Sequence, residues 1–180
     1  MIIIGLGANI PSKCGAPAAT LRKALTRLEI LGIHIVAVSP FYRTQAWPDP
    51  ADPPFVNAVA VVQTRLQPME LLNLLHRVET EYGRMRSAPN SPRTLDLDLI
   101  DHDGLVMHGA VNLPHPRMAQ RSFVLVPLAR IAPDWRHPET GEGVAALLER
   151  LPDRDAPVIL ERDPENWVQL SGQLRDQTKN

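Results

Sequence analysis

The sequence of 180 residues is poor in several kinds of residue, and each scarcity excludes a class of protein. Cys14 is its only cysteine, which excludes an intrachain disulfide and a zinc site made of several cysteines. No apolar run approaches the roughly 18 residues of a bilayer-spanning helix, and no charged leader precedes the first apolar run. These absences predict a soluble protein of the reducing cytoplasm that has no membrane partner.

The chain also has few aromatic residues and almost no net charge. Three Phe, three Trp and two Tyr leave few side chains on which a flat heterocycle could stack. The formal net charge is −1, whereas a domain that binds nucleic acid usually carries a strongly basic stripe. We therefore expect one domain of ordinary size that acts on small molecules and has no nucleic-acid partner.

Glycine-rich loops that cradle phosphates are missing as well. The sequence contains no Gly-x4-Gly-Lys-Ser/Thr motif, which excludes a P-loop. The opening GLGANI has two of the glycines of a dinucleotide-binding turn, but Ile10 stands in place of the third. Any bound phosphate is therefore expected to be held by side chains.

Hydrophobic periodicity predicts the main elements of a mixed fold. Strands are expected at residues 2–6, 33–42, 55–63 and 94–100, and helices at 17–31 and 68–82. Glycines that suit helix ends, Gly32 and Gly83, follow the two helical segments. The order predicts a ferredoxin-like βαββαβ sandwich of the α+β class, with both helices on one face of a mainly antiparallel sheet.

Further features modify this simple order. Pro40 falls within the second strand, so a sheet edge or a bulge is expected there. After the last strand we expect an extra hairpin through Leu105, Val106 and Val111, and then C-terminal helices, one of them near residues 144–151. Residues 1–151 are predicted to form one domain, on which residues 152–180 pack as a tail.

The segment RTLDLDLI sets two aspartates side by side in one strand. Because side chains alternate between the faces of a strand, Asp96, Asp98 and Ile100 share one face while three leucines take the other. At about 6 Å and an effective dielectric near 20, two carboxylates repel by roughly 3 kcal/mol. A positive group should therefore lie beside them, either an arginine such as Arg93 or a divalent cation such as Mg²⁺.

Basic residues lie in the loops that flank this strand. Arg84 and Arg86 precede it, Arg93 stands at its start, and His115 and Arg121 follow it. Since arginine binds phosphate oxygens through two parallel hydrogen bonds, these loops predict a phosphate site over the aspartates. On the second helix, His76 and Glu79 are spaced to hold a metal, although an ordinary polar helix face is the favoured interpretation.

Six segments of the chain, in the same order, resemble one family of enzymes. They are GLGANI, SPFYRTQAW, PPFVNAVA, VETEYGRMR, PRTLDLDLI and LPHPRMAQRSFVLVPLARIAP, and they extend over about residues 1 to 135. The family is 6-hydroxymethyl-7,8-dihydropterin pyrophosphokinase, of folate biosynthesis. The resemblance implies an ATP- and magnesium-dependent diphosphotransferase that moves a pyrophosphoryl group from ATP to the pterin hydroxymethyl and leaves AMP.

The resemblance also implies roles for individual residues. Asp96 and Asp98 are similar to the family's ligands for two Mg²⁺ ions, and Arg84 and Arg93 are expected to join them in catalysis. The pterin is expected to lie between Phe55 and Phe123, with its edge on Asn57 and on the backbone near Thr44 and Trp47. The residues implied in ATP binding are His76, Arg84, Arg86, Arg93, His115 and Arg121.

One segment departs from the resemblance. Between Arg86 and Arg93 the chain reads SAPNSP, where many relatives carry a basic residue. A phosphate-binding arginine would then be missing, which concerns ATP affinity more than the chemistry. This loop and the proline-rich loop after Thr44 are expected to close over the bound substrates.

Two other functions remain open at this point. The βαββαβ order is also that of the RRM, an RNA-binding module that stacks bases on exposed aromatics of its central strands. The strand TLDLDLI offers carboxylates instead, which would repel a phosphate backbone. A noncatalytic regulator that binds a pterin or a nucleotide is the second alternative. The protein is expected to be a monomer.

Overall fold

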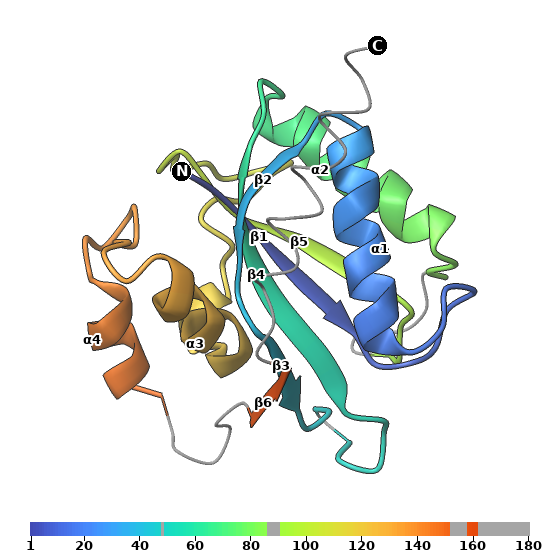
Figure 1. The fold of residues 1–180 in the computed structure, drawn as a ribbon. Coiled ribbons are helices and arrows are strands. Elements are labelled where there is room, and N and C mark those ends of the chain that lie inside the picture. The colour runs from blue at the N-terminus through green and yellow to red at the C-terminus, as the bar shows by residue number, and fades with distance from the viewer. Residues whose placement is uncertain (48, 86–90, 152–157, 162–180) are drawn as a thin grey trace.

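An antiparallel sheet forms the centre of the protein, which we describe from a computed structural model (Figure 1). The structure describes residues 1–47, 49–85 and 91–151, together with the backbone of residues 158–161. The strands are β1 (Ile2–Ala8), β2 (His34–Val38), β3 (Phe41–Thr44), β4 (Phe55–Gln63), β5 (Asp96–His102) and β6 (Val158–Glu161). They lie in the order β5-β1-β4-β3-β6, and β2 also pairs with β4, so the predicted ferredoxin-like arrangement of strands is confirmed.

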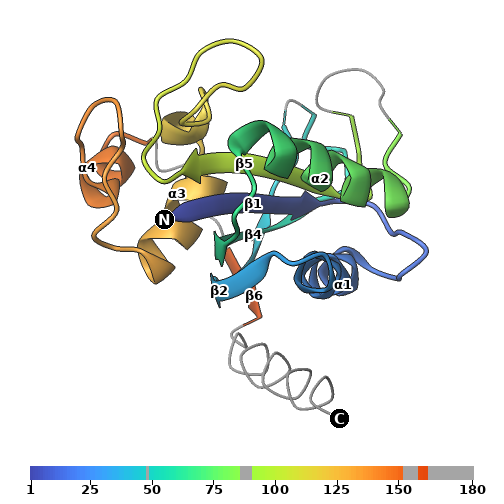
Figure 2. The ribbon, with the colours of Figure 1, turned by 90° about the horizontal axis from the view of Figure 1, so that it is seen from above.

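Two helices cover one face of this sheet, α1 (Pro17–Ile30) and α2 (Pro68–Glu81), as Figure 2 shows. Both begin with proline in the first turn, where its missing N–H costs nothing. Their apolar stripes meet the inward side chains of β1 and β5 in the main core, which includes Leu21, Leu75 and Leu97. The predicted placement of both helices on one face is thereby confirmed.

The predicted strand over residues 33–42 is divided in two by Ser39 and Pro40. Both parts, β2 and β3, pair with the same edge of β4. Because Pro40 has no N–H, the ladder is completed at Ser39: its N–H donates to the Val59 carbonyl at 2.9 Å, and the Val59 N–H donates to the Ser39 hydroxyl at 3.0 Å. The expected irregularity at Pro40 is therefore a break between two strands.

The opposite face of the sheet is partly covered by α3 (Ser122–Ile131), α4 (Val144–Glu149) and the short 3₁₀ helix η1 (Met118–Gln120). A second core forms there, in which Leu125 and Leu128 of α3 pack against Ile3, Val59 and Ile100 of the sheet. The apolar run VLVPLARIAP, to which the sequence pattern assigned no element, thus supplies α3. The helix expected near residues 144–151 is present as α4.

The expected hairpin after β5 is reduced to a single bridge between Met107 and Leu113. Leu105 and Val106 are 42% and 45% exposed, so they do not form the apolar face that a paired strand would need. Among the described residues, no helix combines the length and the apolar character needed to cross a bilayer.

Candidate active site

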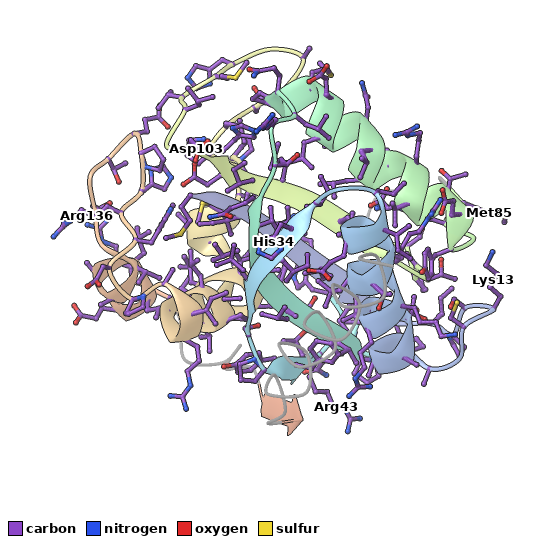
Figure 3. The ribbon with its side chains drawn as sticks, turned by 45° about the horizontal axis from the view of Figure 1, so that its top comes forward. Lys13, His34, Arg43, Met85, Asp103 and Arg136 are labelled. Carbon is purple, nitrogen blue, oxygen red and sulfur yellow. The ribbon has the colours of Figure 1, made fainter. Side chains whose placement is uncertain are left out.

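The two aspartates lie on the sheet face opposite α1 and α2, at the end of the sheet that α3 leaves uncovered. Leu97 and Leu99 point into the main core, while Ile100 belongs to the second core, as the alternating pattern predicts. Asp96 and Asp98 keep 24% and 34% of their side chains exposed. Figure 3 labels Met85, which precedes β5 in the chain, and Asp103, which directly follows the strand at the end opposite Asp96.

Two glycines of β1 make the floor beneath the aspartates. Gly5 pairs with Asp98 and Gly7 pairs with Asp96 across the β1–β5 ladder. A Cβ at Gly7 would lie 3.0 Å from Asn57 Oδ1, which is tight, and at an ordinary contact distance of 3.7 Å from Asp96 Cβ, so any larger residue would crowd Asn57. From the sequence these glycines were considered as the end of a strand, as part of an incomplete dinucleotide-binding turn and as part of the segment GLGANI; in the structure they lie beside the aspartates.

Asp96 is held by two arginines from the loop before the strand. Arg84 Nη1 contacts Asp96 Oδ1, and Arg93 Nη1 donates to Asp96 Oδ2 at 3.2 Å. Burial acts to lower the pKa of Arg84, but the Asp96 and Glu79 carboxylates outweigh it and raise that pKa. Arg84 is therefore a permanently charged link to Asp96.

Asp98 has its own basic neighbours from the segment after the strand. Arg121 Nη1 donates to Asp98 Oδ2 at 3.1 Å, and His115 Nε2 lies 3.9 Å from the same oxygen. Burial lowers the pKa of both His115 and Arg121, although Asp98 opposes this for each. A neutral His115 near pH 7 follows, and in a neutral imidazole one ring nitrogen donates while the other accepts.

Arginines thus supply the positive charge that the paired aspartates require. The same carboxylates also suit a divalent cation, because Mg²⁺ prefers oxygen ligands and is commonly held by one or two carboxylates plus substrate phosphates. Among the described residues, no group of three or more His, Cys, Asp or Glu side chains is arranged to hold a metal. Any Mg²⁺ bound here would therefore depend on oxygen ligands from a substrate and from water.

Glu79 is an acidic member of this region that the sequence interpretation placed wrongly on a polar helix face. Its side chain is only 3% exposed, and Oε1 accepts the outward N–H of Leu97 at 2.7 Å and also contacts Arg84. Burial raises the pKa of Glu79 to about 7, against the opposing effects of the Leu97 hydrogen bond and the Arg84 charge. Glu79 therefore holds both the edge of β5 and the arginine that reaches Asp96.

The predicted pterin-binding residues of β3 and β4 lie beside the aspartates. Asn57 Nδ2 donates to Thr44 Oγ1 at 2.7 Å, where β3 and β4 run side by side. The Arg93 guanidinium lies 5.4 Å from the centre of the Phe55 ring. The Arg121 guanidinium lies 5.4 Å from the centre of the Phe123 ring. Each predicted aromatic is thus joined through one arginine to one aspartate.

Other predicted residues are not part of this cluster as described. The Trp47 side chain is 72% exposed, and the expectation for that residue concerned its backbone. His76 is half-buried on α2, one turn before Glu79, and its contact with ATP stays a prediction. Arg86 and most of the altered loop lie outside the described residues.

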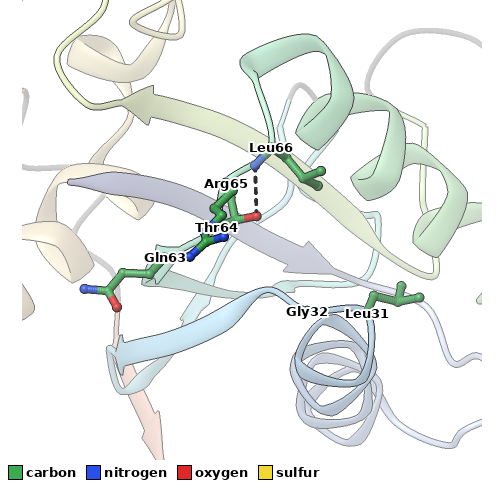
Figure 4. A pocket seen from close by; sticks show the side chains of 6 residues that line it. All are labelled: Leu31, Gly32, Gln63, Thr64, Arg65 and Leu66. Atoms are coloured by element: carbon green, nitrogen blue, oxygen red, sulfur yellow. Dashed lines mark hydrogen bonds between the residues drawn. The ribbon is translucent and has the colours of Figure 1, made fainter.

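An open hollow lies between the end of α1 and the β4–α2 turn, and Figure 4 shows it with the Leu66 N–H bonded to Thr64 Oγ1. None of the predicted site residues is among the residues that line it.

Comparison with known proteins identifies the family. Residues 3–133 match the model of the 7,8-dihydro-6-hydroxymethylpterin-pyrophosphokinase family. The chain belongs to this family. The family predicted from the six sequence segments is therefore confirmed, and the predicted activity is the one that the family's name states.

Relatives in this pyrophosphokinase family include proteins of different length. The chain is 39% identical to the 2-amino-4-hydroxy-6-hydroxymethyldihydropteridine pyrophosphokinase of Synechocystis sp., over 83% of this chain and 75% of that protein. It is 40% identical to the enzyme of the same name from Pseudomonas aeruginosa, over 84% of this chain and 91% of that protein. It is 34% identical to the folic acid synthesis protein fol1 of Pneumocystis carinii, over 88% of this chain but only 21% of that protein.

Solved structures agree on the fold. The crystal structure of wild-type Plasmodium falciparum HPPK-DHPS superposes with a TM-score of 0.64 at 12% identity, over 82% of this chain and 40% of that chain. A likeness at this identity shows the architecture, and it confirms the predicted α+β fold of a pyrophosphokinase domain. The chain thus spans less than half of that longer protein.

Proposed function

We propose that this protein transfers a pyrophosphoryl group from ATP to the hydroxymethyl group of 6-hydroxymethyl-7,8-dihydropterin in folate biosynthesis. The observation that carries the proposal is the pair Asp96 and Asp98, each bound by an arginine that also lies over a phenylalanine. This arrangement offers a polyanion site and two aromatic surfaces within one cluster. Membership of the pyrophosphokinase family supports the assignment of those surfaces to a pterin.

The reaction proposed is an in-line displacement at the β-phosphorus of ATP. The pterin hydroxyl oxygen forms the new bond, the bond from that phosphorus to the oxygen bridging the α-phosphate breaks, and AMP leaves with that oxygen while the hydroxyl proton is released to water. Asp96 and Asp98 would hold two Mg²⁺ ions, which supply charge neutralisation of the phosphates and a lower pKa for the hydroxyl. Arg84, Arg93, Arg121 and His115 would bind and orient the triphosphate, so catalysis rests mainly on positioning and electrostatics.

The same cluster explains how a pterin would be recognised. Phe55 and Phe123 would cover its two faces, since offset stacking of aromatic rings is favourable. Asn57 offers both a donor and an acceptor to the ring edge, and its bond to Thr44 fixes the orientation of its amide. His76 and Arg86 are proposed to extend the ATP site.

We propose that the enzyme works as a monomer in the cytoplasm, a compartment that its single cysteine led us to expect. The RNA-binding alternative finds no support in the site, because β5 presents Asp96 and Asp98 on the face where an RRM would stack bases. The noncatalytic regulator differs from the enzyme only in turnover. A single measurement of product therefore separates them.

The test is one incubation with ATP, Mg²⁺ and 6-hydroxymethyl-7,8-dihydropterin, analysed for AMP and pterin diphosphate. We expect AMP to form in proportion to pterin and to disappear when pterin is omitted or EDTA is added. Formation of ADP would contradict pyrophosphoryl transfer, and substrate binding without AMP would favour the regulator. Retention of single-stranded RNA on filters at physiological salt would support the RNA-binding alternative.

A further inference from the structure

Asn9, which follows β1, is a buried polar residue that none of the predicted roles includes. It is 4% exposed, and all of its hydrogen-bonding groups described here go to two other loops. Its Oδ1 accepts the Arg93 N–H at 2.7 Å, and its own backbone N–H donates to the Arg93 carbonyl at 3.1 Å. Its Nδ2 donates to the Pro53 carbonyl at 3.1 Å. One side chain therefore joins three segments that are remote in sequence.

Both of the segments tied by Asn9 lead directly into the site. Pro53 lies two residues before Phe55, and Arg93 carries the guanidinium that lies over the Phe55 ring and bonds to Asp96. The contacts form a closed ring, from Asn9 to Arg93, from Arg93 to Phe55, along the chain to Pro53, and back to Asn9. This ring spans the junction between the aromatic side and the carboxylate side of the cluster.

The chemistry of the ring requires an amide at this position. A backbone N–H only donates and a backbone carbonyl only accepts, so the partners Arg93 N–H and Pro53 carbonyl need one acceptor and one donor on the same short side chain. Asparagine supplies both. An aspartate would keep the bond to Arg93 but would set a carboxylate oxygen against the Pro53 carbonyl, and an alanine would lose both bonds.

We propose that Asn9 is a positioning residue that fixes the distance between the pterin-binding side and the phosphate-binding side of the site. This inference rests on the proposed function, because the spacing matters only if two substrates must meet there. The hydrogen bonds described for Asn9 go to backbone groups of Arg93 and Pro53. It acts through the backbones of residues 53 and 93, and a displacement of about 1 Å at a reacting centre is sufficient to cost about a hundredfold in rate.

The test compares Asn9→Asp and Asn9→Ala with Thr20→Val. Thr20 is a fully buried residue of α1, and its hydroxyl bonds to Ala16 and Ser12 lie on the other face of the sheet. Loss of those bonds provides a control for the cost of removing a buried polar contact. For each variant we would measure the melting temperature, kcat and KM for each substrate, and amide hydrogen exchange of the substrate-free protein.

If Asn9 positions the two sides, Asn9→Asp should lower the hydrogen-exchange protection of the amides of residues 51, 52 and 55–57 but keep that of the Arg93 amide, and Asn9→Ala should lower both. We expect kcat to fall about tenfold or more in each, whereas Thr20→Val keeps kcat at an equal or lower melting temperature. Unchanged kcat in Asn9→Asp, or losses that simply follow the melting temperature in all three variants, would overturn the inference. Because the exchange data need no substrate, they test the tether even if the wild-type protein makes no AMP, a result that would reject the proposed function instead.

Discussion

One sheet face carries two regions of opposite character, and the same three strands build both. Towards one end, Ile3, Val59 and Ile100 support the second core beneath α3. The site occupies the same face further along these strands, at the positions two and four residues away from those three. These positions are Gly5 and Gly7 on β1, Asn57 and Phe55 on β4, and Asp98 and Asp96 on β5. The same strands continue through both regions, with one register shift of the β1–β5 ladder between Ile3 and Ile4. Side-chain size on β1 therefore sets where a helix packs and where a ligand has room.

The largest difference between the two regions should appear when their aspartates are replaced by asparagine. Asp96→Asn or Asp98→Asn should lower kcat about a thousandfold or more, since metal-assisted charge neutralisation is worth several kcal/mol, while the fold persists. AMP formation and the melting temperature would be measured together. Near-normal turnover of either variant at limiting Mg²⁺ would remove the metal assignment.

Asp101 provides the matched control on the same strand. It is 2% exposed, and its two oxygens accept from Trp135 Nε1 at 2.8 Å and from the Gly104 N–H at 3.0 Å. An amide satisfies only one of these donors, so Asp101→Asn should cost about 1–3 kcal/mol of unfolding free energy. It should leave kcat within about twofold below the melting transition, as expected of a carboxylate outside the site.

Phe123 tests the boundary between the regions, because it packs on the second core and also lies under Arg121. Phe123→Ala should weaken pterin binding about tenfold or more while ATP binding stays nearly unchanged, as titration calorimetry with each ligand would show. Phe41→Leu, in the main core, should lower stability without changing either affinity. Equal loss of both ligands in Phe123→Ala would mean that this residue is structural.

The glycine floor offers a smaller and more local change. Gly7→Ala places a methyl group 3.0 Å from Asn57 Oδ1, so Asn57 must shift, and we expect the pterin KM to rise by roughly 3- to 10-fold. Gly143→Ala is a suitable control because nothing lies within 4 Å of its added methyl group. An unchanged KM for pterin in Gly7→Ala would show that the site accommodates a methyl group at this position.

The effect that should change the chemistry of the site least is the pH dependence of stability, through Glu79. Its folded pKa of about 7 exceeds the ordinary value of 4.5, so between these pH values the folded state holds a proton that the unfolded state has released. The free energy of unfolding should therefore fall as pH rises from about 4.5 to 7, by at most about 3 kcal/mol, and then level off. Urea titrations at pH 5 and 7.5 should show this slope in the wild type and its loss in Glu79→Gln. An identical slope in both would assign it to another group.

Much of this comparison was predictable from the sequence. The alternation in TLDLDLI correctly placed three leucines in the core and both aspartates on the other face, because strand periodicity is a local property. The flanking basic residues were also expected, and the structure brings Arg84, Arg93, His115 and Arg121 to the two carboxylates. Local pattern was sufficient where the site lies on or beside one strand.

Non-local features were not predictable in the same way. Glu79 resembled an ordinary helix-surface residue, because its real partner is the outward N–H of an edge strand that only the assembled fold brings near. Asn9 resembled a turn residue, since Pro53 and Arg93 are 44 and 84 positions away. Helix α3 was missed because its run is mostly apolar and contains Pro127, a residue that usually interrupts a helix. The one local hint was the spacing of Glu79, which lies three residues after His76 on the same helix.

The Glu79 contact with Leu97 has a consequence for how the molecule behaves in a crowded solution. Strand β5 ends the sheet, and a bare outer strand is a template on which another chain can add its own strand. By occupying the Leu97 amide from α2, the buried carboxylate blocks that template near the start of β5. The side chain that supports the arginine of the site thereby also discourages self-association of the folded protein.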